Sequence, residues 1–376
     1  MKQKISLYLD EIKTKGLYRS RHLFEQSGFC NFSSNDYLNL TTDKQVREAF
    51  LRGFERYPAG SGASQAVCGY HPTHKMLEYE FCQFMQVDSA LLFSSGYAAN
   101  LAVVSMLAKL DTHLLIDKGV HASFYDGIKY SGVSYSRFLH NSRRDLLNKL
   151  NGISTGGVII SEGIFSMSGQ QPDLKQVAQD ALAHSYECII DEAHSFGVLE
   201  DKGRGASAFY GLSQKDIALR IIPFGKAMGA QGAVVVGRHE WIDALFHSGR
   251  STIYSTAISP AMAYGLLHSL EAVSKSNDKR IYIRLLVDYF RSQISKSPLC
   301  WRDSGTPIQQ LQLGCPELAA SFAARLLERK IIALSMRQPT VSRKETGLRI
   351  VLNASHRQED IDYLFACLHE FYENQY

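Results

Sequence analysis

Two short stretches of the chain each end an apolar run in residues that can do chemistry. The first, Cys188-Ile-Ile-Asp-Glu-Ala-His194, ends in a carboxylate, Asp191, and an imidazole, His194. The second, Arg220-Ile-Ile-Pro-Phe-Gly-Lys226, ends in a lysine that is followed by small residues. Short apolar runs closed by polar residues are typical of strands in a parallel sheet that is buried on both faces. Ligands of such sheets bind beyond the carboxyl ends of the strands, where these three side chains would lie.

The combination of Asp191 with Lys226 suits pyridoxal phosphate (PLP). A carboxylate can keep the pyridine nitrogen of this cofactor protonated, and a lysine can carry the Schiff base that joins it to the chain. Lys226 could instead be a solvated lysine, and Asp191 a structural carboxylate. The apolar residues before Lys226 and the small ones after it favour a functional role. A carboxylate at the end of an apolar strand also needs a partner.

Four further stretches could contact such a cofactor or its substrate, although each has an ordinary structural explanation. Phe93-Ser-Ser-Gly-Tyr97 predicts a strand–turn–helix junction, whose free N–H groups would suit a phosphate. His121 follows a strand and could stack on an aromatic ring or simply cap a helix. Ser166 could donate to a phenolate oxygen or bond its own backbone in a turn. Arg349 lies in an apolar strand and needs an anion, either a substrate carboxylate or an internal acid.

The surrounding sequence alternates strands with helices from residue 90 to residue 237. Besides the two strands that end near Asp191 and Lys226, apolar runs predict strands at 90–93, 113–117, 158–161 and 233–237, with helices at 98–110, 121–130 and 174–184. This alternation predicts an α/β fold with a mainly parallel sheet and helices on both faces. Upstream, Thr73 is expected to cap a helix with Leu77, Phe81, Phe84 and Met85 on its apolar face.

After Pro260 the pattern changes. A long helical stretch reaches about Ser295, helices are expected at 316–330 and 361–368, and strands at 331–334 and 347–352. A chain of 376 residues is too long for one small core. We therefore expect an N-terminal arm at 1–44, a large cofactor-binding domain at 45–270 and a smaller α+β domain at 271–376.

Composition argues against several classes of protein. The 41 basic and 37 acidic residues leave a net charge of only +4 and are scattered, which gives nucleic-acid binding little support. Seven cysteines without a Cys-x-x-Cys pair read as reduced packing residues. No apolar run approaches the roughly 20 residues of a membrane span, and the N-terminus has no hydrophobic signal core. A cytoplasmic protein without a membrane or nucleic-acid partner is expected.

Two motif matches fail on their context, and a third motif is absent. Asp-Glu-Ala-His at 191–194 is also a helicase box, but a helicase needs Gly-x-x-x-x-Gly-Lys-Ser/Thr, and Ala227 follows Lys226. Gly152-Ile-Ser-Thr-Gly156 fits a hydrolase pattern, yet it precedes a strand, whereas a nucleophile elbow must follow one. No His-Glu-x-x-His occurs, so no metal is expected.

Taken together, the motifs resemble the α-oxoamine synthases, a family of PLP enzymes of fold type I. Ten blocks occur in the family's order: S-S-N-D-Y-L at 33–38, G-S-G-A-S at 60–64, H-x-x-L-E at 74–78, F-S-S-G-Y-A-A-N at 93–100, H-A-S at 121–123, E-G-I-F-S-M at 162–167, D-E-A-H-S-x-G at 191–197, G-K at 225–226, Y-S-T at 254–256 and L-R-I at 348–350. Each block is weak, whereas ten in order are highly specific. The resemblance implies an aspartate aminotransferase-like fold and a homodimer with shared active sites.

The resemblance also implies a role for each candidate residue. Lys226 would carry the Schiff base and transfer protons, Asp191 would pair with the pyridine nitrogen, and His121 would stack on the ring. His194 and Ser166 would bond the phenolate oxygen. The remaining positions would be Ser95, Gly96 and Tyr97 beside the cofactor, Ser255 and Thr256 on the phosphate of the neighbouring subunit, and Arg349, Arg19 (with Arg21 as the alternative) and Thr340 on the substrate.

The implied reaction is the decarboxylative condensation of L-alanine with a pimeloyl thioester, carried by acyl-carrier protein or coenzyme A, in biotin biosynthesis. One alternative is a sibling enzyme that uses glycine or serine with another acyl-CoA. Another is a catalytically silent PLP-fold binding protein, against which the retention of Lys226, Asp191, His194 and His121 argues.

Three residues depart from the family's pattern. Pro223 stands where the family usually has a serine or threonine that holds the phosphate, and proline offers neither a hydroxyl nor an N–H. The cofactor is therefore held more weakly unless other donors suffice. Gln65 replaces a usual arginine and Asn39 a usual glycine, which bears on the handling of the acyl substrate.

Overall fold

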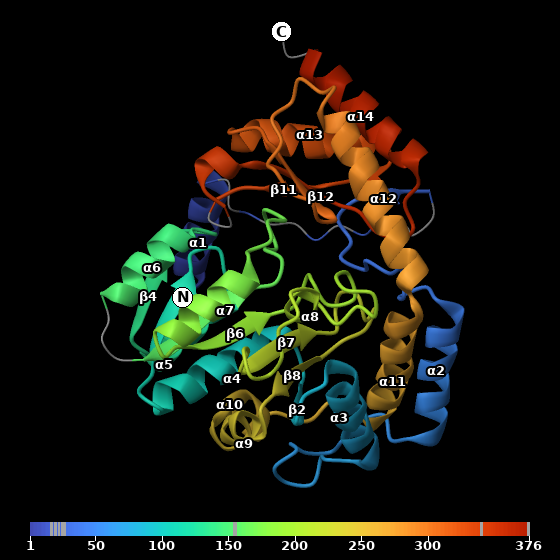
Figure 1. Cartoon of the computed structure of the whole chain (residues 1–376). Coiled ribbons are helices and arrows are strands. Elements are labelled where there is room, and N and C mark those ends of the chain that lie inside the picture. The colour runs from blue at the N-terminus through green and yellow to red at the C-terminus, as the bar shows by residue number, and fades with distance from the viewer. Residues whose placement is uncertain are drawn as a thin grey trace.

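The computed structural model describes residues 1–15, 18, 21, 23, 28–152, 156–338 and 341–373. Within them, one sheet has seven strands in the order β2-β8-β7-β6-β5-β3-β4 (Figure 1). Only β8 runs antiparallel to its neighbours in this sheet, so the prediction of a mainly parallel sheet is confirmed. The strands are β2 (Ser89–Phe93), β3 (His113–Asp117), β4 (Tyr135–Phe138), β5 (Gly157–Glu162), β6 (Glu187–Asp191), β7 (Leu219–Pro223) and β8 (Ala233–Gly237).

Helices cover both faces of this sheet because the central strands are apolar on both sides. Successive side chains of a strand point to opposite faces. Ile116 and Ile189 pack in one cluster with helices α4 (Gly96–Lys109), α5 (Ala122–Ser131) and α9 (His239–Ser248). Leu115 and Ile190 pack in another with α6 (Arg143–Asn151), α7 (Leu174–Ala183) and α8 (Ala206–Phe209). The apolar run of each central strand therefore ends where the strand passes beyond the helices that cover the two faces of the sheet.

The C-terminal part of the chain has a sheet of its own. Strands β11 (Leu334–Met336), β12 (Gly347–Val351) and β9 (Ile308–Gln312) pair antiparallel in that order. Helices α13 (Pro316–Glu328) and α14 (Gln358–Glu373) and a 3₁₀ turn (Arg343–Glu345) complete the α+β arrangement at the top of Figure 1. The long helix expected from Pro260 is interrupted at Ser276, which separates α11 (Pro260–Lys275) from α12 (Asn277–Ile294).

The N-terminal segment contacts both halves of the molecule. Helix α1 (Lys2–Thr14) buries no residue. Strand β1 (Cys30–Asn31) pairs in parallel with β10 (Ile331–Ile332), so the strand expected at 331–334 is divided between two sheets. Helix α2 (Lys44–Arg56) lies beside α11 (Figure 1). Phe32 and Tyr37 are buried in a core cluster that includes residues of both large sheets. The division into domains at residues 44 and 270 stays a prediction.

Three helix starts differ from the prediction, among them α14, which begins at Gln358 rather than at 361. Helix α3 (Pro72–Met85) begins before Thr73, and its N-cap is His71, whose backbone N–H donates to His74 Nδ1 at 3.0 Å. Proline is favoured at the first position of a helix, which explains the earlier start. Helix α4 begins at Gly96 rather than at 98, with Ser95 as its N-cap. Within the described residues, no helix is long and apolar enough to cross a bilayer.

Candidate active site

Strands β5, β6 and β7 end at one cavity of about 120 Å³. The residues that line it come from these strand ends and from the starts of α4 and α5: Gly96, Tyr97, Asn100, His121, Glu162, Ser166, Asp191, Ala193, His194, Pro223 and Lys226. Seven predicted site residues are therefore brought together, although they span 131 positions of the chain, from Gly96 to Lys226. The parallel sheet produces this convergence, because its strands all end at the same edge.

Asp191 is the last residue of β6 and is held by two donors. Its Oδ1 accepts from the Ala193 N–H at 2.9 Å, and its Oδ2 accepts from Asn100 Nδ2 at 3.0 Å. The side chain is buried. Hydrogen bonds to a buried carboxylate stabilise its ionised form and fix its orientation. The sequence predicts no role for Asn100, which is the last residue of the block at 93–100.

Lys226 follows β7 in a tight loop. The Phe224 N–H donates to the Gly232 carbonyl oxygen, and the Phe224 carbonyl oxygen accepts from the Ala230 N–H, which closes the loop. Burial lowers the pKa of the Lys226 amine, and the nearby carboxylates of Asp191 and Glu162 oppose that shift. Among the described residues, none forms a hydrogen bond or an ion pair with its Nζ. A partly desolvated, unpaired amine is suited to attack a carbonyl group.

Two imidazoles flank these groups. His194 Nδ1 lies 2.7 Å from the Tyr37 hydroxyl, and burial, with a further effect of Lys226, lowers the pKa of His194 well below its usual value. His121 is the N-cap of α5, and its Nδ1 accepts from the Ser123 N–H at 3.3 Å. Burial lowers the pKa of His121 as well. Both rings are therefore favoured in the neutral form, which can stack or donate a hydrogen bond.

Glu162 is a cavity residue that sequence reasoning missed. Its Oε2 accepts from the Ser166 N–H at 3.3 Å, while Oε1 is buried without a partner in the described structure. Burial, together with the charge of Asp191, raises the pKa of Glu162 well above its usual value. The sequence did contain a signal, because Glu162 ends an apolar strand as Asp191 does.

Arg349 approaches the site from the other sheet. The guanidinium is buried, its Nε donates to the Ser166 carbonyl oxygen at 2.6 Å, and its Nη2 donates to Asn35 Oδ1 at 2.9 Å. Both partners are neutral, and no acid of the described chain forms an ion pair with it. No internal acid of the described residues therefore pairs with Arg349, and the binding of a substrate carboxylate stays a prediction.

Other predicted residues do not line the cavity. Ser95 uses its hydroxyl oxygen to accept from the Ala98 N–H at 3.1 Å. Ser255 and Thr256 follow α10 (Arg250–Ile253), and Arg21 is exposed. The predicted role of Ser255 and Thr256 on a neighbouring subunit stays a prediction. Arg19 and Thr340, and Ser154 of the hydrolase-like pattern, lie outside the described residues.

The cavity fits an aromatic phosphate with an aldehyde group. The free amine of Lys226 and the oriented carboxylate of Asp191 match the two ends of such a ring. Asn100 Oδ1 and Glu162 Oε1 are buried polar atoms that have no protein partner. A side chain at Gly96 would place its Cβ 2.5 Å from Pro223 Cγ, so only glycine fits at the start of α4. The Ala98 N–H is bonded to Ser95 Oγ, whereas the N–H groups of Gly96 and Tyr97 have no partner among the described residues and could bond an anion.

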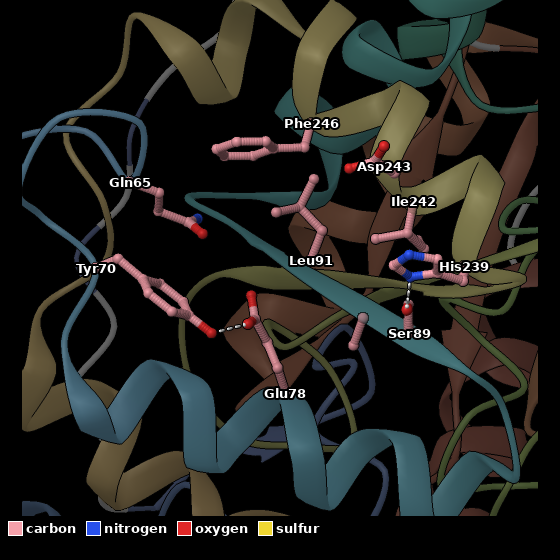
Figure 2. Close-up of a pocket in the computed structure, with 10 residues that line it drawn as sticks. Gln65, Tyr70, Glu78, Ser89, Leu91, His239, Ile242, Asp243 and Phe246 are labelled. Atoms are coloured by element: carbon pink, nitrogen blue, oxygen red, sulfur yellow. Dashed lines mark hydrogen bonds between the residues drawn. The ribbon is translucent and has the colours of Figure 1, made fainter.

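A second cavity, of about 240 Å³, lies at the open edge of β2 and differs in its chemistry (Figure 2). Gln65 Nε2 donates to the Leu92 carbonyl oxygen at 2.8 Å, and Glu78 Oε1 accepts from the Leu92 N–H at 3.2 Å. Glu78 Oε2 also accepts from the Tyr70 hydroxyl at 2.6 Å. Gln65 and Glu78 thus bond the backbone groups of Leu92 that an edge strand leaves without a neighbouring strand. Gln65 thus has a structural partner away from the lysine cavity.

Comparisons with known proteins identify the family of the chain. The family model for aminotransferase class I and II matches residues 27–368. The 8-amino-7-oxononanoate synthase of Methylococcus capsulatus is 37% identical over 96% of this chain and 96% of its own length. That of Thioalkalivibrio sulfidiphilus is 35% identical over 96% and 95%.

Solved structures give the same result. The crystal structure of 8-amino-7-oxononanoate synthase from Francisella tularensis matches with a TM-score of 0.83 and 31% identity, covering 93% of this chain and 100% of that one. A serine palmitoyltransferase from S. paucimobilis, solved with PLP and myriocin, matches with a TM-score of 0.91 over 99% of this chain and 97% of that one. At 23% identity it shows the fold alone. The chain therefore belongs to the aminotransferase class I and II family, and within it to the PLP-dependent α-oxoamine synthases.

Proposed function

We propose that this chain condenses L-alanine with a pimeloyl thioester, releases carbon dioxide and the thiol carrier, and makes 8-amino-7-oxononanoate for biotin biosynthesis. The observation that carries the proposal is the meeting of Lys226 and Asp191, from adjacent strands, in a cavity with unpaired buried polar atoms. The full-length relatives named 8-amino-7-oxononanoate synthase support the choice of product.

The proposed cofactor site uses the predicted residues. Bound PLP supplies an aldehyde that bonds an amine and a ring that accepts electrons. Lys226 would hold the aldehyde end, Asp191 the pyridine nitrogen, and His121 the ring face. His194 and Ser166 would bond the phenolate oxygen. The phosphate would be held by Ser95, Gly96 and Tyr97 and by Ser255 and Thr256 of a neighbouring subunit, in a homodimer with shared sites.

The proposed substrate chemistry depends on Lys226 and Arg349. Arg349 would bind the alanine carboxylate, because its planar fork has neutral partners and spare donors. Lys226 would take the proton from the alanine α-carbon, since its lowered pKa increases the fraction of neutral amine. The same amine would return a proton to that carbon after carbon dioxide has left. Arg19, with Arg21 as the alternative, and Thr340 would contact the substrate.

A two-part experiment tests this function. The purified chain is loaded with PLP, reduced with borohydride and mapped by peptide mass spectrometry, and the label is expected on Lys226 and on no residue of a Lys226→Ala variant. Wild type is then incubated with alanine and pimeloyl thioester, on acyl-carrier protein or on coenzyme A, and 8-amino-7-oxononanoate is expected. A label elsewhere would refute the site, while turnover only with glycine or serine would identify a sibling reaction.

A further inference from the structure

A chain of hydrogen bonds joins the two residues proposed to lie on the cofactor ring. Asn100 Nδ2 donates to Asp191 Oδ2 at 3.0 Å and to Ser123 Oγ at 2.9 Å. Ser123 Oγ lies 2.8 Å from His121 Nδ1. Asn100 and Ser123 are 2% and 0% exposed. The connection from Asp191 to His121 therefore runs entirely through buried side chains.

The number of donors fixes the orientation of the Asn100 amide. An amide nitrogen carries two hydrogens, whereas the amide oxygen only accepts. Both hydrogens are used, one on Asp191 and one on Ser123. A flipped amide would turn Oδ1 towards the Asp191 carboxylate. Both oxygens are acceptors, so they would repel each other instead of forming a hydrogen bond. In the observed orientation Oδ1 is buried without a partner among the described residues. The two donated bonds offset this cost.

Ser123 fixes the hydrogen position on His121. The Ser123 backbone N–H donates to His121 Nδ1 at 3.3 Å, so that nitrogen acts as an acceptor and carries no proton. Ser123 Oγ already accepts from Asn100, which leaves its own hydrogen free to point at the same nitrogen. A neutral imidazole with Nδ1 as acceptor has its proton on Nε2.

We propose that Asn100 and Ser123 are positioning residues, which hold the Asp191 carboxylate and the neutral His121 ring in the arrangement that the PLP ring requires. The inference rests on the proposed function. A protonated pyridine ring is attracted by an ionised carboxylate but repelled by a cationic imidazolium stacked on it. Asn100 favours the ionised carboxylate of Asp191, and Ser123 opposes a cationic imidazolium at His121. The network therefore sets the charge of both groups that would contact the PLP ring.

The first test examines the protein without PLP. Full-length protein is labelled with ¹⁵N-histidine, freed of PLP and sedimented for NMR, and a His121→Gln variant assigns the His121 signals. Wild type is expected to have the proton on Nε2. In Ser123→Ala the backbone N–H bond to Nδ1 at 3.3 Å remains, but the shorter hydroxyl contact at 2.8 Å is lost, so part of the population is expected to shift to the Nδ1–H form. Ser269→Ala is the matched control, because Ser269 is fully buried and its hydroxyl has no partner in the described structure. An unchanged His121 signal in Ser123→Ala would overturn the proposal.

The second test measures the dissociation constant for PLP. Asn100→Asp keeps the shape of the side chain but replaces the donors by a second acid beside Asp191. We expect affinity to fall by about tenfold or more, with Asn100→Ala less affected. A purely structural role predicts wild-type affinity for the isosteric Asn100→Asp, and that result would overturn the positioning role alone. If wild type binds no PLP, the proposed function fails instead, whatever the His121 signal shows.

Discussion

Arg349 donates from its guanidinium Nε to the carbonyl oxygen of Ser166 at 2.6 Å. Arg349 lies in β12 of the C-terminal sheet, and Ser166 lies in the loop that follows β5 of the main sheet. A second bond, to Asn35 Oδ1 at 2.9 Å, adds the N-terminal segment. One side chain therefore ties three parts of the chain together beside the lysine cavity and keeps its positive charge unneutralised by any acid of the described residues.

Replacing Arg349 by lysine should weaken the binding of alanine. Lysine keeps the positive charge but has no planar group of donors. It cannot bond Ser166 and Asn35 and at the same time offer two parallel hydrogen bonds to a carboxylate. We expect the KM for alanine to rise about tenfold or more, with PLP affinity nearly unchanged. Steady-state kinetics and a PLP titration measure both. Arg302→Lys is the matched control, because Arg302 bonds Gln170 and Glu345 instead. An unaltered KM in Arg349→Lys would exclude Arg349 from the alanine site.

Replacing Pro223 by threonine should tighten the binding of PLP. Pro223 ends β7, lines the cavity and lies against Gly96 at the start of α4. Threonine adds a hydroxyl and a backbone N–H at this position, and one further hydrogen bond to an anion lowers a dissociation constant by roughly tenfold. Equilibrium dialysis of PLP gives the measurement. Pro223→Ala restores the N–H alone and so separates the two donors. Equal affinity in all three proteins would show that the phosphate needs neither.

The strands that position the site were predictable, whereas one strand of the C-terminal sheet was not. Strands β6 and β7 are continuous apolar runs that end in polar residues, because both faces of the main sheet are covered. Strand β9 has the sequence Ile-Gln-Gln-Leu-Gln, which reads as a surface segment. Gln309 and Gln310 are nonetheless buried, and their amides donate to the backbone carbonyls of Thr306 and Glu345. Side-chain bonds to backbone carbonyls leave no periodic pattern in the sequence, and that of Gln310 also joins residues 35 positions apart.

The candidate site shows the same limit. Lys226, Asp191, His194 and His121 follow strands, and their positions could be predicted from the end of each apolar run. The hydrogen-bond partners that orient them could not, because Tyr37 lies 157 positions from His194 and Asn100 lies 91 positions from Asp191. Only the fold brings these pairs together.

Replacing Glu162 by glutamine should stabilise the apoprotein at neutral pH. The pKa of Glu162 is raised well above 4.5, mainly by burial. The unfolded chain therefore releases its proton at a pH where the folded chain still holds it, and stability falls as the pH rises above about 4.5. Glutamine is neutral at every pH, so Glu162→Gln removes the contribution of this residue to the pH dependence of stability. Urea unfolding of the apoprotein at a series of pH values measures the effect. The exposed Glu11→Gln is the control, and parallel pH profiles for wild type and Glu162→Gln would refute a proton on Glu162.

Acid should destabilise the attachment of the N-terminal segment through His356. This buried ring stacks on Phe32 at 4.2 Å between centroids, its Nδ1 accepts from the Asn353 N–H, and its Nε2 donates to the Asn31 carbonyl oxygen. Burial lowers the pKa of His356 from 6.5 to about 4. Between pH 6.5 and about pH 4 the His356 ring is protonated in the unfolded chain but stays neutral in the folded chain. The free energy of unfolding therefore falls as the pH drops through this window and levels off below it. The loss attributable to His356 is at most roughly 3 kcal/mol.

His356→Gln tests this pH dependence. Glutamine cannot take up the proton, so the variant should be less stable than wild type at neutral pH, by about 1–2 kcal/mol for its lost bonds, yet show a shallower decline as the pH falls from 6.5 towards 4. Urea unfolding at each pH gives the two curves. His247→Gln, at an exposed position of α9, is expected to follow wild type. Curves for His356→Gln and wild type that stay parallel throughout this window would show that the ring takes up its proton as readily in the folded chain as in the unfolded chain, so that its pKa is not lowered.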